Sequence, residues 1–491
     1  MSARGLALSV TCALALAACG STVQTAGQIA PGQELGGAAP STAGTDLSSG
    51  GSVAGGGAVG GSGTSVSGSG PAATGTAAGV DGSTGPGTGP AVSIPSASKT
   101  LLVGVPYVDQ QQSSAFTAGI SSGLQTGDPK ANYQFLVDDL NKQGGILGRK
   151  VVIVFHRVDA TESQVQYEQE TCTDFAQDHR VPFVLGGLSP TLAKCLIDKG
   201  VAVLGDGGQL NTKDYATMRY FVQPGSIALD RLAQLQASEF TKMGLFKSTV
   251  PARVGILYYD VPSFRYAEGV LKAGLQQRGI QIAVEEAFHQ PSSTQDVGQT
   301  EAQVQAAVLK FKAEGVTHVV AVELNAWLQG FFALYASQQD YYPRYGWTSN
   351  QVPTNAQAAV PHKELEGSLV LGFYPTYDTE KQSDYPPATR RCLAQLGSHG
   401  VAFTSGNQRA DAVTACDAVH YLKAALTAAG GVTRDALVAG ARALGRTYAP
   451  ASTYASVMPL GYGAGLAAMR PGAWSTACDC FAYTGKPYPV A

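Results

Sequence analysis

The chain has 491 residues, with 33 Lys and Arg against 36 Asp and Glu, which gives a formal net charge of −3 at pH 7. This balance, without any run of Lys or Arg, supplies no basic surface and argues against nucleic-acid binding. Residues 99–491 contain no apolar stretch approaching the about 18 residues that cross a bilayer, so no membrane-spanning helix is expected there.

The first 18 residues have the pattern of a secretory signal peptide. Arg4 precedes an apolar run, too short to span a bilayer, that ends in small residues. The run closes as LAACG over 16–20, which resembles the lipobox of bacterial lipoproteins. The resemblance implies cleavage before Cys19, acylation of that residue with chains such as palmitate, and a lipid anchor on the extracytoplasmic face of the cell membrane. The alternative is a secreted protein in which Cys19 merely lies near an ordinary cleavage site.

Residues 19–98 are expected to form the lipidated Cys and a flexible linker. Positions 20–98 contain no aromatic residue, no Lys or Arg, and only three acidic residues. Such a Gly, Ser, Thr and Ala segment offers too little apolar area to offset the entropy lost on folding. The folded part is therefore expected to begin near Lys99.

Six cysteines remain once Cys12 leaves with the signal peptide and Cys19 takes lipid. An even number in an exported chain indicates disulfides. Two pairs of cysteines are separated by 23 and 24 residues, which favours a disulfide within each pair and leaves the last two cysteines to pair with each other. The expected pairs are Cys172 with Cys195, Cys392 with Cys416, and Cys478 with Cys480. A zinc site is the alternative, but the thiols are not grouped as two close pairs with ligand spacing.

From Thr100 onwards, short apolar runs alternate with stretches of helical period, which is typical of parallel strands joined by crossover helices. The first series predicts strands over 101–107, 150–155, 181–185 and 201–204, and helices around 133–140, 162–177 and 191–199. The second predicts helices over 228–243, 264–278, 299–314 and 326–338, and strands over 253–259, 281–287 and 318–322. A strand over 367–374, helices over 387–396 and 409–429, and short strands around 453–458 and 480–483 complete the chain.

These two series predict an α/β fold with two lobes, because the folded part exceeds the about 250–300 residues at which a single core stops growing. Each lobe is expected to be a mainly parallel sheet flanked by helices. The expected first lobe comprises 99–223 and about 377–450, and the second comprises 224–376 and about 451–491.

Four stretches in this order carry a resemblance to a known family. They are DDLNKQGGILGRK (138–150), VLGGLS (184–189), GILYYD (255–260) and CDAV (416–419). Together, behind a lipobox, they resemble the type I periplasmic binding proteins, and specifically the branched-chain amino-acid-binding-like substrate-binding lipoproteins of ABC transporters. The resemblance spans nearly all of 100–490. It implies a small ligand enclosed between two lobes by a hinge that lies in crossings such as 221–226 and 373–376.

In open α/β sheets, ligands bind beyond the carboxyl ends of the strands, near helix N-termini with free N–H groups. The resemblance accordingly places first-lobe ligand contacts at Tyr107, Asp109, Gln112, Leu188, Ser189, Asp206, Gly207 and Gly208. Asp206 stands where the family holds a ligand carboxylate with a small and a hydroxyl residue, and its charge would repel a carboxylate. The alternative role of Asp206 is to cap the following helix or turn.

In the second lobe the resemblance places the family's aromatic contact at Phe264 or Tyr266, and further contacts at Glu323, Asn325 and Asn350. In the family, an acidic residue that binds the ligand's ammonium falls at positions equivalent to 348–351, where this chain has no acid. Glu323 is its expected replacement. Asn350, in contrast, suits an uncharged polar ligand. Other roles stay open for these residues. Tyr107 and Phe264 could be core or lobe-interface aromatics, Tyr266 the first buried residue of its helix, and Glu323 part of an internal salt bridge.

No motif for catalysis stands out in residues 99–491. The nucleophile elbow GxSxG, a His pair at helical spacing and a phosphate-binding GxxxxGK[ST] loop are all missing from the sequence. We therefore expect no enzyme, no cofactor and no metal. The predicted function is capture of a small polar ligand, such as an amino acid or an amide, for an ABC permease. The alternatives are an extracytoplasmic sensor that uses the same two lobes, or an enzyme whose site the sequence does not reveal.

Overall fold

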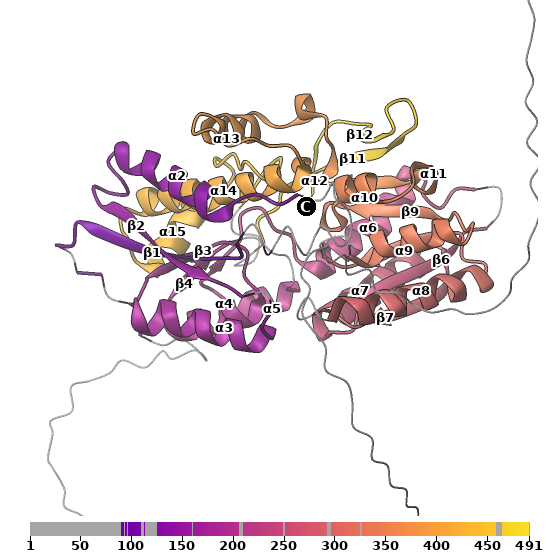
Figure 1. Ribbon diagram of the computed structural model, residues 1–491, viewed down its shortest axis with the longest axis horizontal. Coiled ribbons are helices and arrows are strands. Elements are labelled where there is room, and N and C mark those ends of the chain that lie inside the picture. Colours follow the sequence, from indigo (N-terminus) through magenta and orange to yellow (C-terminus); the bar gives the residue numbers. More distant parts are fainter. Residues whose placement is uncertain are drawn as a thin grey trace, which may run out of the picture. The chain divides into compact units, whose positions relative to one another are not determined.

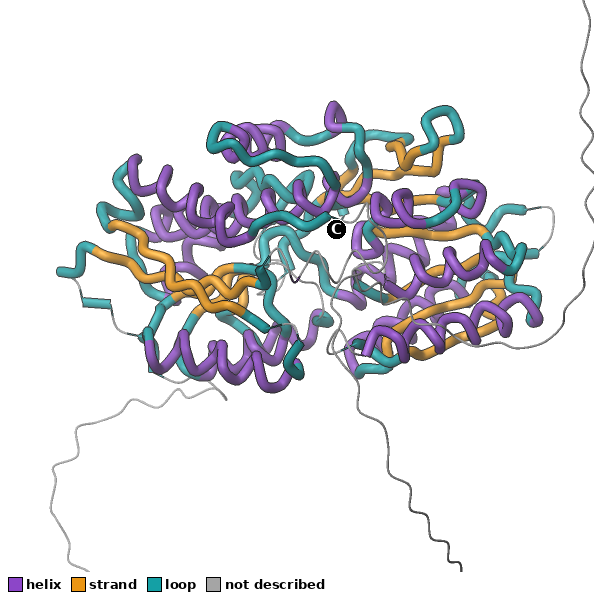
Figure 2. Tube along the Cα trace, viewed as in Figure 1, coloured by secondary structure: helices purple, strands orange, loops and turns teal. Residues whose placement is uncertain are grey.

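The computed structural model describes residues 90–92, 94–95, 97–109, 112, 125–159, 161–205, 210–248, 251–291, 296–324, 327–457 and 464–490. Within these ranges, strands alternate with crossover helices, and the strands form two sheets (Figure 1). Helices flank both sheets, as Figure 2 shows in purple and orange. This is the predicted α/β architecture.

Five parallel strands in the order β2-β1-β3-β4-β5 form the sheet of the first lobe. They are β1 (Thr100–Tyr107), β2 (Lys150–Arg157), β3 (Phe183–Leu185), β4 (Ala202–Leu204) and β5 (Phe221–Val222). The helices between them are α2 (Pro129–Lys142), α3 (Gln164–Thr173), continued by a π-helical turn over Asp174–Asp178, α4 (Pro190–Asp198) and α5 (Thr212–Thr217). Three later helices also pack on this lobe: α13 (Pro387–Gly397), α14 (Gly406–Ala429) and α15 (Arg434–Leu444).

The sheet of the second lobe repeats this order, with parallel strands β7-β6-β8-β9-β10. They are β6 (Arg253–Tyr259), β7 (Gln281–Phe288), β8 (His318–Val322), β9 (Arg344–Thr348) and β10 (Leu369–Gly372). Antiparallel strands β11 (Ala468–Ser475) and β12 (Cys480–Tyr483) extend the sheet, and β13 (Tyr488–Pro489) pairs with β11. The helices are α6 (Leu229–Met243), α7 (Pro262–Gln276), α8 (Val297–Ala313), α9 (Trp327–Gln338), a 3-10 turn over Ser349–Gln351, α10 (Pro353–Ala359), α11 (His362–Leu365) and α12 (Pro375–Asp378).

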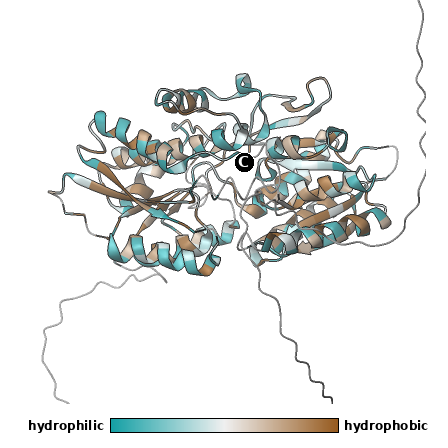
Figure 3. Ribbon diagram, in the orientation of Figure 1, coloured by the Kyte–Doolittle hydropathy of each residue, from teal (hydrophilic) through white to brown (hydrophobic). Residues whose placement is uncertain are grey.

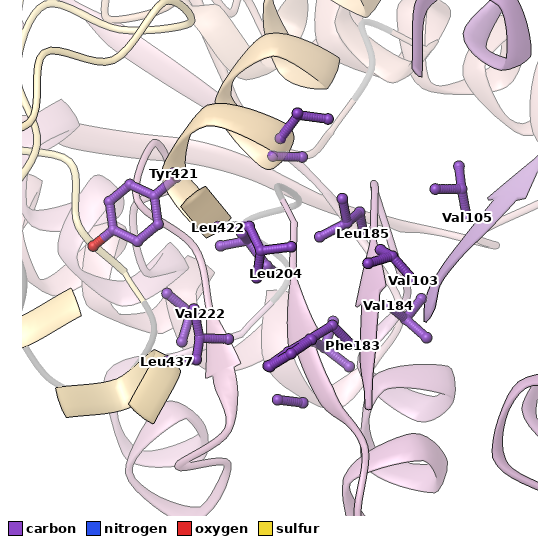
Figure 4. Packing of buried hydrophobic residues seen from close by; sticks show 14 of the residues in the cluster. Val103, Val105, Phe183, Val184, Leu185, Leu204, Val222, Tyr421, Leu422 and Leu437 are labelled. Atoms are coloured by element: carbon purple, nitrogen blue, oxygen red, sulfur yellow. The ribbon is translucent and has the colours of Figure 1, made fainter. Parts of the chain in front are cut away.

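Each sheet is buried between helices, and each lobe has its own hydrophobic core. The strands are mostly apolar, in brown in Figure 3, because parallel strands covered on both faces need apolar side chains on both. In the first core, Phe183 and Leu204 from the sheet pack with Tyr421 and Leu422 of α14 and Leu437 of α15 (Figure 4). The chain therefore returns to the first lobe after completing most of the second.

The stretch at 138–150 owes its sequence to the tight return from α2 into β2. Gly144 and Gly145 have φ of 94° and 70°, and a Cβ on Gly145 would lie 1.9 Å from the Arg149 carbonyl oxygen. Only glycine fits there without moving the backbone. The Asn141 side chain then donates to the Val151 carbonyl and accepts from its N–H, both at 2.8 Å, so it fixes the start of β2.

Three crossings between the lobes lie against one another at Gly225. A Cβ on this residue would lie 2.8 Å from Ser452 Oγ and 3.8 Å from the Tyr374 ring, so residues 223–226, 373–376 and 451–453 run close together. Asp417 of α14 holds the third crossing by accepting hydrogen bonds from Tyr448 OH, Ala451 N, Ser452 N and Ser452 Oγ at 2.6–2.9 Å. The CDAV stretch thus serves to anchor a crossing.

The folded part begins before Lys99, contrary to expectation. Val92 and Ile94 pack against the first core, and Val92 N donates to the Gly200 carbonyl at 3.5 Å. Arg149 donates to the carbonyl oxygens of Pro95 and Ser98. Because Gly200 precedes β4 and Arg149 precedes β2, this segment crosses the amino ends of the strands.

Several elements differ from the sequence prediction. Residues 453–458 form no strand over the part described, where Ser456 makes an isolated bridge to Leu466. Strand β10 is shorter than the expected 367–374. Strands β9 and β11 and helix α15 were not predicted. Arg and Gly interrupt the apolar pattern of β9, Arg, Pro and Gly interrupt that of β11, and α15 follows α14 after a short loop.

All three expected disulfides are present. Cys172–Cys195 joins α3 to α4, Cys392–Cys416 joins α13 to α14, and Cys478–Cys480 closes the turn between β11 and β12. The first two lie in the first core. Each of them therefore ties one helix of the first lobe to its neighbour.

Removing the Cys172–Cys195 disulfide by paired Ala substitutions should lower the free energy of unfolding by about 3 kcal/mol, because the unfolded chain regains the entropy of an open loop. Urea unfolding of the oxidised protein measures this. The matched control is the Cys478 and Cys480 pair, whose very short loop should contribute much less. Equal midpoints for the wild type and the first variant would contradict the prediction.

Candidate functional site

A pocket of about 380 Å³ lies in the first lobe, beyond the carboxyl ends of β1, β2 and β3. This volume is within the about 300–1,000 Å³ usual for small-molecule sites. Its wall comes from the loops after these strands and from α2, α3, α4, α12 and α14. The lining residues are Pro106, Tyr107, Val108, Thr126, Gly127, Pro129, Tyr133, Val158, Tyr167, Glu168, Gly186, Gly187, Leu188, Ser189, Leu192, Tyr377, Asp411 and Thr414.

Ser189 links two walls of the pocket. Its hydroxyl accepts from Leu192 N at 3.1 Å, which caps the N-terminus of α4, and it donates to Glu168 Oε1 on α3. Gln164 Nε2 donates to the same carboxylate oxygen at 2.7 Å. Glu168 is 4% exposed. The carboxylate is thus held in place at the pocket surface by two neutral donors, next to the disulfide that joins the same two helices.

Asp411 supplies a second carboxylate, from α14. Its Oδ2 accepts from Gly127 N at 2.8 Å, just before α2 begins. A Cβ on Gly127 would lie 3.2 Å from this oxygen, so the close approach suits glycine. The hydrogen bond fixes the loop that enters α2 against the long helix α14, and so shapes that side of the pocket.

The two helices that begin at the pocket present few free N–H groups. Both α2 and α4 have Pro at their first position, which removes one donor. The third position is capped in each case, Ala131 N by Asp128 and Leu192 N by Ser189. Helix N-termini bind anions through such N–H groups, so their use by Pro and by caps leaves little for a ligand carboxylate.

Four tyrosines complete the wall: Tyr107, Tyr133, Tyr167 and Tyr377. The Tyr107 ring packs edge-to-face on Phe155 with centroids 5.8 Å apart, and Lys130 Nζ lies 5.4 Å from its centroid. Burial raises the pKa of Tyr167 to about 12, so its phenol stays neutral at physiological pH. The pocket is therefore aromatic as well as acidic.

The predicted first-lobe residues divide into two groups. Tyr107, Leu188 and Ser189 line the pocket. Asp109 instead pairs with Arg157, 2.7 Å between Oδ2 and Nε, and accepts from Gln112 N, while Gln112 Nε2 donates to Asp159 at 3.2 Å. Asp206, Gly207 and Gly208 lie outside the described residues, so their predicted role stays a prediction.

In the second lobe, the predicted aromatic contacts are placed apart from the pocket. Phe264 is 1% exposed in the second core, edge-to-face with Tyr259 at 5.5 Å between centroids, which is the alternative considered from the sequence. Tyr266 is exposed rather than the first buried residue of α7, and Lys213 Nζ lies 4.7 Å from its ring centroid. Asn325 lies outside the described residues.

Glu323 caps a helix and forms no salt bridge with a described residue. Its Oε2 accepts from Leu328 N at 2.7 Å and its Oε1 from Gln329 N at 2.8 Å, at the start of α9. The side chain is 1% exposed, and burial raises its pKa to about 8, although the two N–H donors oppose the shift. Both oxygens thus bind backbone N–H groups of α9, and the predicted contact of Glu323 with a ligand ammonium stays a prediction.

Asn350 is buried in the 3-10 turn after β9. Its N–H donates to Thr348 Oγ1 at 3.2 Å, and its side-chain Nδ2 makes no hydrogen bond to the described residues. The neighbouring Ser349 hydroxyl bonds Phe373 N, Tyr374 N and Asp378, so this turn holds the second crossing. Asn350 does not line the first-lobe pocket.

Glu168, Tyr167, Tyr133 and Asp411 line the pocket but were not among the predicted contacts. All four lie on helices, whereas the sequence argument considered only strand ends. A signal existed for Glu168, because it precedes Cys172 by one helical turn and so shares the face that the disulfide turns towards α4. For Asp411 the sequence offered no comparable signal.

Within the described ranges, no helix is long and apolar enough to cross a membrane, and no three or more His, Cys, Asp or Glu residues are grouped to hold a metal ion.

Two α/β lobes with the same strand order, joined by three crossings, define a type I periplasmic binding fold. Residues 120–461, more than half of the chain, match the sequence profile of the periplasmic binding protein family, and the chain belongs to this family. The family consists of extracytoplasmic solute-binding proteins. No curated protein matches the sequence.

Solved structures with the same fold include several substrate-binding proteins of ABC transporters. One from Desulfitobacterium hafniense in complex with leucine has 15% identity and a TM-score of 0.54, and covers 78% of this chain and 99% of that chain. One from Rhodopseudomonas palustris with p-hydroxybenzoic acid has 15% identity and a TM-score of 0.56, with 79% and 97% covered. A fatty acid ABC transporter protein from Thermomonospora curvata has 15% identity and a TM-score of 0.58, with 80% and 92% covered. These identities establish the fold and leave the ligand open.

Glu323→Gln should lower the free energy of unfolding by about 1–3 kcal/mol, because the new amide group faces a backbone N–H as donor against donor. Ligand affinity of the folded protein should stay unchanged. The raised pKa of Glu323 also makes the free energy of unfolding depend on pH. The folded state holds this proton more tightly than the unfolded chain, so the stabilisation is present below pH 4.5 and is lost as pH rises towards 8, and the variant lacks this component.

Urea unfolding across this pH range and ligand titration of the folded protein measure the two effects. Glu314→Gln, at an exposed position after α8, is the matched control. Weaker ligand binding by Glu323→Gln with unchanged stability would contradict the capping role.

Proposed function

We propose that the protein is an extracytoplasmic solute-binding lipoprotein, anchored through Cys19, that captures a small polar ligand between its lobes and delivers it to an ABC importer. Amino acids and amides are the first ligand classes to consider. The observation that carries the proposal is the first-lobe pocket. It lies beyond the strand carboxyl ends, where α/β sheets bind ligands, in a chain of the solute-binding family.

The proposed contacts combine predicted and newly identified residues. Tyr107, Leu188 and Ser189 are joined by Glu168 and Asp411 as side chains that line the pocket. Asp206 and Asn325 remain proposed contacts from the sequence. Closure of the second lobe over this wall would exclude water and strengthen the polar contacts.

The three crossings at Gly225 supply the proposed hinge. Two of them are held at a lobe by hydrogen bonds, the second crossing through Ser349 and the third through Asp417, which confines rotation to the few residues between these anchors. Short segments that absorb a change of φ and ψ while packed lobes move as units are typical of hinge closure.

A lipid anchor agrees with the position of the N-terminal segment. Residues 90–98 cross the amino ends of the first sheet, and the pocket is at the carboxyl ends. The described chain therefore reaches the first lobe at the end opposite the pocket. Acyl chains on Cys19 would hold the protein at the membrane.

Cys19→Ser should abolish incorporation of labelled palmitate and move the protein from the membrane fraction to the soluble fraction, because the acceptor thiol is lost. Cell fractionation and fluorography of the full chain measure both. Cys12→Ser is the matched control, since it removes a nearby cysteine of the signal peptide and should leave labelling unchanged. Full labelling of Cys19→Ser would refute the anchor.

The full-length protein should show a higher melting temperature with one class among amino acids, amides, polyols and small acids, because a ligand that binds only the native state stabilises it. At a concentration about 100 times the Kd, this stabilisation is about 2.7 kcal/mol. A thermal-shift screen measures it, with turnover of each compound followed in parallel. Conversion of the stabilising compound to a product would favour an enzyme instead.

A further inference from the structure

The described lining of the first-lobe pocket includes two acidic side chains and no basic one. Glu168 and Asp411 line it, and no Lys, Arg or His is among its described lining residues. Two basic side chains contact residues at or near this wall, and each already has a partner. Lys130 is exposed, with its ammonium over Tyr107 and Phe155, and Arg157 is paired with Asp109.

Glu168 is the lining residue whose hydrogen bonds decide the argument. It is 4% exposed, yet the groups that bind it, Ser189 Oγ and Gln164 Nε2, are neutral and both donate to Oε1. The other oxygen, Oε2, makes no hydrogen bond to any described residue, although the side chain lines the cavity. A largely buried carboxylate with one oxygen left open and no cationic partner is a costly arrangement unless a ligand supplies the partner.

The rest of the wall favours a cation and disfavours an anion. Pro at the first position and a capped third position leave α2 and α4 few N–H groups for a carboxylate. Four tyrosines, in contrast, line the pocket, and aromatic rings attract organic cations, although Lys130 already lies over the ring of Tyr107. The charge, the scarcity of N–H donors and the aromatic lining therefore all favour a cationic ligand.

We infer that the ligand of this pocket carries an organic cation, an amine, guanidine or quaternary ammonium group, which binds at Glu168 Oε2. The inference rests on the proposed solute-binding function and specifies its ligand class. The cationic group lies against the first lobe, between the acidic and aromatic side chains. A carboxylate is not accommodated next to it on this wall.

The test compares compounds of similar size and shape that carry a positive, a neutral or a negative group. Choline is measured against its neutral carbon isostere dimethylbutanol and the corresponding acid dimethylbutanoate, and benzylamine against benzyl alcohol and benzoate. Putrescine, agmatine, leucine and glutamine complete the panel. Thermal shift identifies the compounds that bind the full-length protein, and calorimetric titration then gives their affinities.

We expect at least one cationic compound to bind and its neutral and acidic counterparts to bind more than tenfold more weakly. Glu168→Gln should lower the affinity for the cation by more than tenfold, because it removes the charge opposite the ligand and keeps the side-chain size. Glu170→Gln, two residues along α3 at an exposed position, is the matched control and should bind as the wild type does. Glu168→Asp keeps the charge and should retain more affinity than Glu168→Gln, provided that melting of the unliganded variants shows both to be folded.

The outcomes separate the two proposals. Binding of neutral compounds, of acids or of zwitterionic amino acids in preference to every cation would overturn the cationic ligand and leave solute binding intact. Equal cation affinity in Glu168→Gln and wild type would also overturn the assignment to Glu168. If no compound of any class raised the melting temperature, the solute-binding proposal would fail as well.

Discussion

The first-lobe pocket depends on how Ser189 divides its hydroxyl between two neighbours. As an acceptor it caps α4, and as a donor it fixes the Glu168 carboxylate on α3. The Cys172–Cys195 disulfide joins the same helices on the buried side. The two helices are thus held at the pocket surface by a hydrogen bond and in the core by a covalent bond. This pair of restraints sets the position of the one carboxylate oxygen that remains open to a ligand.

Elsewhere the protein uses buried carboxylates to hold its own backbone. Glu323 caps α9, Asp417 binds the third crossing with four hydrogen bonds, and Asp378 accepts from Ser349 and Tyr483 next to the second. Burial raises the pKa of Asp378 to about 8 and also raises the pKa of Asp417. In each case several donors from the protein surround the acid. Glu168 differs from these three residues because both of its donors reach the same oxygen.

The sequence predicted the α/β class, both series of strands and helices, the three disulfides and the family, because these depend on apolar periodicity, cysteine spacing and local turns such as that at Gly145. It predicted the pocket only in part. Tyr107, the last residue of β1, and Leu188 and Ser189, which come after β3, line the pocket as the family resemblance placed them, and their contact with a ligand stays a prediction. Glu323 also directly follows a strand, and nothing in the sequence shows that its oxygens are used by α9. Asp411 reaches the pocket from a helix about 280 residues beyond α2, as its bond to Gly127 shows, and only the packing of α14 brings it there.

The two lobes share one strand order but differ in the roles of the residues just beyond their strands. In the first lobe, the loop after β3 places Leu188 and Ser189 in the pocket. In the second lobe, Glu323 after β8 instead caps helix α9. A cationic ligand would meet the wall of the first-lobe pocket first, while it is still hydrated, and closure of the second lobe would then remove water. Because a charge pair strengthens as water leaves, the free energy gained at Glu168 would grow during closure and couple ligand charge to the closed state.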